Sequence, residues 1–415
     1  MIYLLIGYMW LFIHRPFEVW TELAELRVER IYMISTILVW LMYPAKTFIY
    51  NRLNGAFALF FAGLVAAWML SPLPEYGEKV IEDYVKVAIF FVLLITSVRD
   101  ERSLRILVAG YLVVVGLYMT HSFWEFLRGQ HVYRMGIPRM VGIDRSYKDP
   151  NTFSATILYS LPMLFPFWVS KQPLWQRLAV LYYLVLSITC ILLTGSRTAL
   201  VGLLCGVGMN VLTSQHRRAA LLVAALSAPA VWFALPADLQ NRFLTLIDSS
   251  YGDAGALTSA QGRSRGFWDG VALWERFPIA GVGPGAFGKA VGHGFQSHHL
   301  YGQILGETGT IGAIAFLAIV LAFFLNGFEV RRWYRRNPDW PRDFCTDLNR
   351  AVITVVCLLL IMGFGGHNLY RYTWMWFGAF QAVAIHVIRQ RTAEAYTSVA
   401  ESSGGLPTSE GIAHG

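Results

Sequence analysis

The sequence predicts an all-α integral membrane protein, a bundle of about twelve transmembrane helices with one large loop on its outer side. Three observations predict this fold class. Apolar residues (AVILMFWYC) make up 55% of the 415 residues, charged residues make up only 14%, and the mean hydropathy is +0.47. Soluble proteins usually contain about 25% charged residues. The composition therefore excludes a soluble enzyme, a disordered protein and a disulfide-bonded secreted scaffold.

The apolar segments define the expected helices one by one. A spanning helix needs about 20 mostly apolar residues, or about 17 where interfacial residues anchor its ends. Twelve segments are candidates: 2–13, 31–43, 55–71, 84–98, 104–123, 152–170, 177–193, 198–213, 218–236, 301–326, 351–367 and 373–388. Several are short or closely connected, so ten or eleven helices is an alternative count. We expect one polytopic membrane domain over 1–391 and a polar, disordered cytoplasmic tail over 392–415.

The net charge of +8 helps to orient this bundle. Basic residues occur in every second short connection, for example at 46–52, 99–105 and 331–336, and the positive-inside rule assigns these connections to the cytoplasm. The long loops 124–151 and 237–300 then lie on the outer side. The 34 basic residues divide about evenly between the two sides, so the outer face contains more arginine than topology alone explains.

The 237–300 loop contains the residues that suggest chemistry. Phe267, Val271 and Trp274 recur at helical spacing, which predicts an amphipathic surface helix over 264–276 with Arg263 at its start. The free N–H groups at a helix start favour an anion. Three further motifs follow along the chain: Pro278-Ile-Ala-Gly281-Val-Gly283, Ser297-His298-His299-Leu300-Tyr301 and Glu307-Thr-Gly309-Thr-Ile-Gly312.

Two shorter motifs lie upstream, Asp149-Pro150-Asn151 and, between two apolar runs, Gly195-Ser196-Arg197. In order and spacing, these motifs resemble those of the O-antigen ligase and polymerase superfamily of bacterial envelope glycosyltransferases, and most of all a lipopolysaccharide O-antigen ligase. The resemblance covers roughly 145–315, and the first 120 residues match only in hydropathy. At one position the sequence departs from the family pattern, because His299 stands where asparagine is usual.

The resemblance implies a GT-C-like fold and an enzyme that takes a glycan from an undecaprenyl-diphosphate carrier. The glycan goes to an acceptor hydroxyl, here of lipid A-core, at the periplasmic face of the bacterial inner membrane. The transfer is inverting, and it requires no metal or other cofactor. The partners are the lipid-linked donor, the acceptor and membrane lipids, with no nucleic acid. A polymerase and a protein O-oligosaccharyltransferase, which differ in the acceptor, are the alternatives within the family.

The resemblance also assigns roles to individual residues. Arg263 and Arg197 would hold the diphosphate, because the guanidinium group pairs with phosphate in a bidentate manner and stays charged. An arginine between apolar runs is costly, which makes Arg197 a functional hypothesis. His298 would accept the proton of the acceptor hydroxyl. The expected substrate-binding residues are Arg265, His299, Tyr301 and Arg145.

Each assignment has an alternative. Arg197 as a snorkelling boundary residue is one, and Arg263 or Arg265 as a lipid headgroup ligand is another. His299 rather than His298 is the alternative base. We expect Glu307 to be structural, and the group His367, Asn368 and Arg371 to pack at a helix end. A small-anion transporter is the hypothesis from a different class, but transporters usually contain inverted repeats, and the sequence shows none.

Overall fold

The structure, a computed structural model, describes residues 1–134, 136–144, 148–168, 173–213, 217–251, 254–292, 294–337, 340 and 343–402. The first half of the chain is helical apart from one antiparallel hairpin, in which Val132 pairs with Arg139. Its elements are α1 (Ile2–Ile13), α2 (Pro16–Val19), α3 (Thr21–Glu25), α4 (Val28–Met42), α5 (Arg52–Met69), η1 (Pro74–Tyr76), α6 (Glu78–Ser97), α7 (Glu101–Leu127), β1 (Val132–Arg134), β2 (Ile137–Arg139), α8 (Pro150–Ser160), η2 (Leu161–Phe167) and α9 (Leu174–Leu193).

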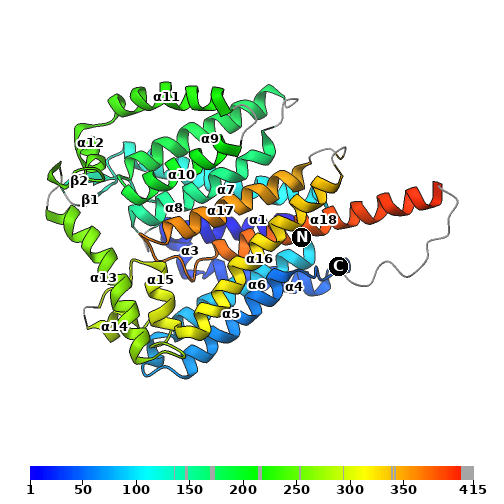
Figure 1. The fold of residues 1–415 in the computed structure, drawn as a ribbon, viewed down its shortest axis with the longest axis horizontal. Coiled ribbons are helices and arrows are strands. Elements are labelled where there is room, and N and C mark those ends of the chain that lie inside the picture. The colour runs from blue at the N-terminus through cyan, green and yellow to red at the C-terminus, as the bar shows by residue number, and fades with distance from the viewer. Residues whose placement is uncertain are drawn as a thin grey trace.

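The second half is helical throughout its described elements. These are α10 (Arg197–Thr213), α11 (Arg217–Ala234), α12 (Ala237–Leu244), η3 (Ser249–Tyr251), α13 (Ala254–Arg276), α14 (Phe287–Val291), α15 (Leu300–Gln303), the π-helical turn η4 (Ile304–Thr308), α16 (Gly309–Arg336), α17 (Phe344–Met362) and α18 (Thr373–Ser402). The long helices run roughly along one direction (Figure 1). At one end of this bundle α12, α13, α14 and the hairpin gather, and at the other end α18 extends beyond its neighbours.

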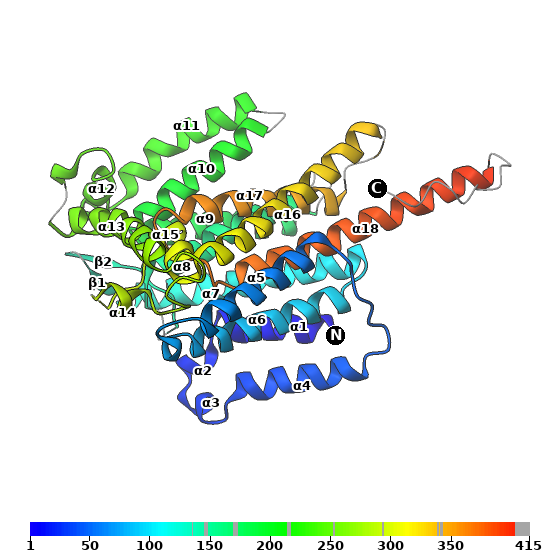
Figure 2. The ribbon, with the colours of Figure 1, turned by 60° about the horizontal axis from the view of Figure 1, so that its bottom comes forward.

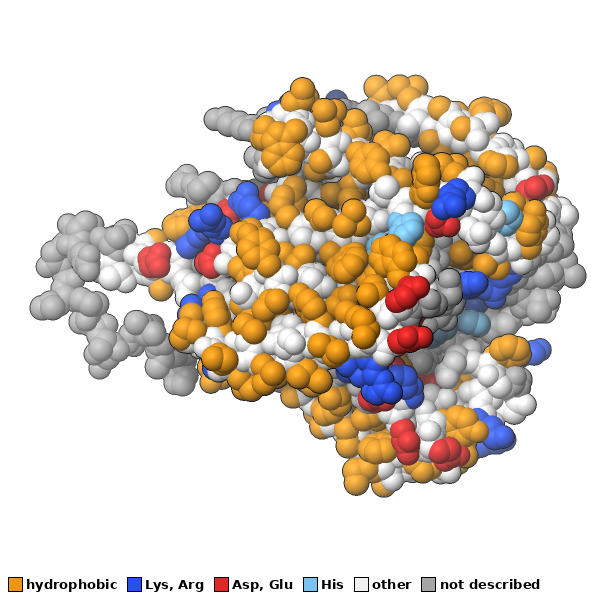
Figure 3. Space-filling view, turned by 180° about the vertical axis from the view of Figure 1, so that it is seen from behind, with side chains coloured by type: hydrophobic (Ala, Val, Ile, Leu, Met, Phe, Trp, Pro, Cys, Tyr) orange, Lys and Arg blue, Asp and Glu red, His pale blue; other side chains and the backbone are white. Residues whose placement is uncertain are grey.

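Each of the twelve predicted segments overlaps a helix. Five of the described helical segments are long and apolar enough to cross a membrane: Arg52–Met69, Glu101–Leu127, Leu174–Leu193, Leu300–Arg336 and Phe344–Met362. The others are shorter or more polar, as α4 and α11 are at opposite edges of the bundle (Figure 2). Apolar side chains cover a broad central zone of the surface in Figure 3, and charged side chains gather toward both ends. This distribution is the one expected of a protein embedded in a bilayer.

Ion pairs join the helices at the end opposite the hairpin. Arg391 of α18 contacts Glu101 of α7 and Asp343 before α17, each at 2.5 Å. Arg52 of α5 and Arg389 of α18 both contact Glu329 of α16, at 2.5 and 2.6 Å. Arg52 of the basic 46–52 connection and Arg389 of α18 therefore lie together on Glu329, and Arg391 joins α18 to the 99–105 connection.

Two predicted boundaries differ from the structure. The surface helix expected over 264–276 begins earlier, at Ala254, so Arg263 lies within α13 and not at its start. The free N–H groups of the helix start therefore do not lie at Arg263, as the sequence predicted they would. The preceding residues include several alanines and no proline, so nothing in the sequence ends the helix there. Similarly, α18 continues to Ser402, because Ala393, Glu394 and Ala395 favour a helix, whereas 403–415 lie outside the described residues.

Glycines let the motif-bearing segments approach one another closely. A Cβ atom on Gly270 of α13 would lie 2.2 Å from the carbonyl oxygen of Gly302 in α15. The turn after α13 packs on η4, where the N–H of Val282 donates to the carbonyl of Gly306 at 2.8 Å. Gly281 and Gly283 adopt φ values of 67° and 98° in this turn, which glycine adopts readily and other residues rarely. The glycines of the motif thus fix α13 against α15 and η4.

The close contact between α13 and α15 gives a stability prediction. We expect Gly270→Ala to lower the free energy of unfolding by about 1–3 kcal/mol, because the methyl group overlaps backbone atoms that cannot move independently. Gly262→Ala on the same helix meets no atom within 4 Å and should stabilise it by up to about 1 kcal/mol. Thermal unfolding of the purified protein in detergent measures both. Equal melting temperatures for the two variants would contradict the packing described here.

Candidate active site

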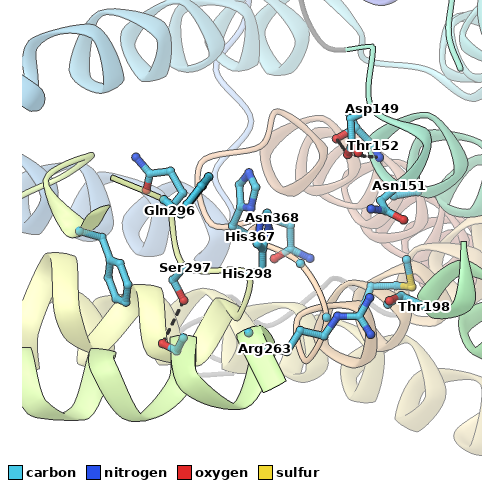
Figure 4. A pocket seen from close by; sticks show the side chains of 18 of the residues that line it. Asp149, Asn151, Thr152, Thr198, Arg263, Gln296, Ser297, His298, His367 and Asn368 are labelled. Carbon is cyan, nitrogen blue, oxygen red and sulfur yellow. Dashed lines mark hydrogen bonds between the residues drawn. The ribbon is translucent and has the colours of Figure 1, made fainter. Parts of the chain in front are cut away.

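A cavity of about 830 Å³ lies at the end of the bundle that carries α13 and the hairpin (Figure 4). Its walls come from α8, α10, α13 and the segments 295–298 and 362–371. Tyr159, Phe287 and Met362 contribute apolar surface. The charged and titratable side chains that line it are Arg134, Arg263, Arg265, Arg371, Asp149, Asp269, His298 and His367. Cationic groups thus outnumber carboxylates in the lining.

Arg263 reaches this cavity from α13 and extends toward Thr198 at the start of α10 (Figure 4). Its guanidinium is half-buried, and burial together with the nearby Arg197 lowers its pKa. Arg265 lines the same cavity from two residues further along α13. Repulsion between Arg263 and Arg197 is relieved when an anion binds between the two guanidinium groups.

His298 is held in the cavity by the residue before it. The hydroxyl of Ser297 donates to the carbonyl of Gly266 in α13 at 3.1 Å, and it accepts from the N–H of His299 at 3.2 Å. The His298 ring lies 5.3 Å from the ring of His367 (Figure 4). Burial lowers the pKa of His298, Arg263 and Arg134 lower it further, and Asp149 opposes them. A neutral imidazole at pH 7 is able to accept a proton.

The neighbouring predicted residues are engaged elsewhere. His299 caps α15, where its Nδ1 accepts from the N–H of Gly302 at 3.3 Å, and its ring packs near Phe267 and Phe364. Tyr301 donates its hydroxyl proton to the carbonyl of Leu360 at 3.0 Å. Neither residue is part of the cavity lining. Arg145 lies outside the described residues.

Arg197 belongs to a second group of arginines, behind the cavity wall. It is only 6% exposed at the start of α10 and donates to the hydroxyl of Thr245 at 3.0 Å. Arg139 is 1% exposed and donates to the carbonyl of Thr194 at 2.6 Å, and Arg242 donates to the carbonyl of Gly195 at the same distance. Burial, with help from Arg242 and Arg134, lowers the pKa of Arg139 to about 9. The turn that carries Arg197 is therefore surrounded by further cations.

Several lining residues were not expected at the site. The group His367, Asn368 and Arg371, interpreted from the sequence as helix-end packing, lines the cavity. Arg371 donates to the hydroxyl of Thr152 at 2.9 Å, and the N–H of Thr152 donates to the side chain of Asp149, the N-cap of α8. Burial, His298 and Arg371 lower the pKa of His367 to about 4. Their proximity to His298 arises from tertiary packing of α17 and α18, which no local motif indicates.

Two polar atoms at the cavity have no partner in the described part of the chain. They are the hydroxyl of Thr198 and the side-chain carbonyl oxygen of Asn368, both on lining residues. Buried polar groups are normally satisfied, so these two atoms are available to hydrogen-bond a bound molecule. No three His, Cys, Asp or Glu side chains among the described residues are close enough together to hold a metal ion.

Residues 182–317 match a protein-family model described as O-antigen ligase. The chain therefore carries a domain of the O-antigen ligase family. The O-antigen ligase domain extends from α9 into α16 and contains Arg197, Arg263 and His298. The rest of the cavity wall, from α8 and from 362–371, lies outside the matched segment. No curated protein matches the chain.

The histidines of this domain and its neighbouring wall predict a pH effect on stability. An unfolded histidine binds a proton near pH 6.5, and the folded pKa of His298 and of His367 lies lower. The unfolded state therefore binds more protons as the pH falls below about 6.5, so the melting temperature should fall from there toward pH 4. The melting temperature of the His367→Gln variant should fall less over this interval than that of the unmodified protein. A steeper loss in this variant would show that His367 does not titrate as described.

Proposed function

We propose that the protein is a lipid-linked glycan glycosyltransferase that ligates O-antigen to lipid A-core. Its donor is a glycan on undecaprenyl diphosphate, and its active site faces the periplasm from the inner membrane. The observation that carries this proposal is the arginine-lined cavity that brings Arg263 beside His298 within the O-antigen ligase domain. The ion-paired end of the bundle, with Arg52, Arg389 and Arg391, would then face the cytoplasm.

The donor diphosphate fits the cationic side of the cavity. Arg263 would contact a phosphate directly, and Arg265, Arg134 and Arg371 line the same space. Arg197, behind Thr198, would add to the positive potential from a less exposed position. Fixed cations aimed at a leaving group stabilise the charge that develops in the transition state. This arrangement suits an oligosaccharide whose lipid carrier departs as a diphosphate.

In the transfer step, one proton moves to the protein and one pair of electrons moves to the leaving group. His298 accepts the proton of the acceptor hydroxyl as the hydroxyl oxygen attacks the anomeric carbon. The bond between that carbon and the diphosphate oxygen breaks on the opposite face, and undecaprenyl diphosphate leaves with the electron pair. Attack from the opposite face inverts the configuration at the anomeric carbon. The lowered pKa of His298 keeps its imidazole neutral and ready for this role near pH 7.

The acceptor distinguishes ligation from the related reactions. A polymerase would add the glycan to a second lipid-linked glycan, and an O-oligosaccharyltransferase would add it to a protein serine or threonine. Purified protein incubated with lipid-linked donor and each acceptor in turn identifies the product. A small-anion transporter is the alternative from a different class, in which the same arginines attract the transported ion. Anion counterflow in proteoliposomes without glycan transfer would favour that alternative.

The mechanism predicts the effect of removing the central side chains. We expect Arg263→Ala and His298→Ala each to lower the rate of glycan transfer by about 100-fold or more. Arg276→Ala is the matched control, because Arg276 is an exposed arginine at the end of the same helix and outside the cavity. Its rate should stay close to that of the unmodified protein. Near-normal transfer by either active-site variant removes that residue from the mechanism.

A further inference from the structure

A second cavity, of about 870 Å³, lies on the other side of α8 and the 367–372 segment from the first. Its walls come from α1, α4, α6 and α7, from the start of α8, and from Gln303 of α15. Most of these elements precede the matched O-antigen ligase segment. Three residues, Thr152, His367 and Arg371, line both cavities. The two spaces therefore share a wall that includes a histidine next to His298.

Three of the five cations that line the second cavity lie beside carboxylates. Lys79 of the second cavity lies 2.8 Å from Asp83, and Lys86 lies 2.7 Å from Glu82. Arg15 similarly contacts Glu18 at 2.8 Å. Arg30 and Arg371 are the other two cations of this lining, and its carboxylates are Glu29, Asp83 and Asp144.

The lining of the second cavity combines aromatic rings with hydrogen-bonding groups. Its aromatic residues are Tyr8, Phe12, Tyr84, Tyr118, Tyr370 and Tyr372. Asp144, which accepts the hydroxyl proton of Tyr118, lines the same space. Gln303 is 4% exposed, and its side-chain carbonyl oxygen has no partner among the described residues, although its NH₂ group donates to Glu307. An unpartnered buried acceptor calls for a donor such as a hydroxyl group.

Sugars carry both kinds of surface that this lining complements. The faces of a pyranose ring present C–H groups that pack on aromatic rings, and its edges present hydroxyl groups. Sites for such ligands are concave, largely apolar and supplied with a few convergent polar groups. The tyrosines and the unpartnered acceptor of Gln303 match this description.

We propose that the second cavity binds the carbohydrate end of the acceptor and presents its hydroxyl across the shared wall to the first cavity. The inference rests on the proposed transferase function. The donor glycan and its diphosphate occupy the first cavity, and the acceptor sugar enters between α1, α4 and α6. Thr152, His367 and Arg371 then lie where the two substrates meet.

Substitutions on one helix test this assignment. Met33 of α4 lines the second cavity, whereas Leu38, on the same helix, is 56% exposed and outside it. We expect Met33→Trp to fill part of the cavity and raise the KM for lipid A-core about tenfold, with the KM for the lipid-linked donor unchanged. Leu38→Trp should leave both constants unchanged. Gln303→Leu removes this hydrogen-bond acceptor at similar size, together with the donor to Glu307. It should raise the acceptor KM alone by about tenfold, equivalent to about 1.4 kcal/mol.

The outcomes separate this inference from the function on which it rests. Absence of transfer by the unmodified protein would overturn both. Transfer by the unmodified protein with an unchanged acceptor KM in Gln303→Leu would overturn the acceptor site alone. A raised donor KM in that variant would do the same, because it would assign the second cavity to the donor. If Met33→Trp does not fold, Gln303→Leu decides the question.

Discussion

Repulsion among arginine side chains is the physical constraint around which the active-site end is organised. Arg139, Arg197 and Arg242 surround the turn between α9 and α10, and Arg263 adds its charge from α13. Burying like charges near one another is costly unless they are paired or hydrogen-bonded. Backbone carbonyls of that turn satisfy Arg139 and Arg242. The remaining positive potential is best compensated by an anionic ligand, which a diphosphate provides.

The surrounding fold holds this cationic site rigid. Gly270 and Gly302 let α13 and α15 touch through their backbones, and Ser297 ties the His298 segment to α13. On the opposite wall, Tyr370 donates to the buried Glu307 at 2.7 Å, which fixes the segment that carries His367 and Arg371. Glu307, expected from the sequence to be structural, makes this contact from the π-helical turn η4. Active sites require such supporting contacts, because small displacements of a catalytic group cost large factors in rate.

Much of the fold could be predicted from the sequence, since apolar length determines where membrane helices form. Arg263, Arg265 and His298 could also be brought to one site, because they fall in motifs of one loop with a recognisable order. The positions of His367 and Arg371 in the lining, and of Arg139 and Arg242 behind it, could not be predicted, because only the packing of distant segments brings them there. That His298 lines the cavity while His299 caps α15 was likewise not visible in the sequence. The start of α13 was missed because the residues before Arg263 contain no stop signal.

The central claim is that the arginine-lined cavity binds a diphosphate, and ligand-induced stabilisation tests it most directly. The measurement is the melting temperature of the purified protein with increasing undecaprenyl diphosphate, compared with undecaprenol, which has the same chain and no charge. A ligand that binds only the folded state raises the melting temperature in proportion to its affinity. We expect a saturable rise with the diphosphate alone, strongly reduced in Arg263→Gln and at high salt. An equal rise with undecaprenol, or a rise that Arg263→Gln leaves intact, would contradict it.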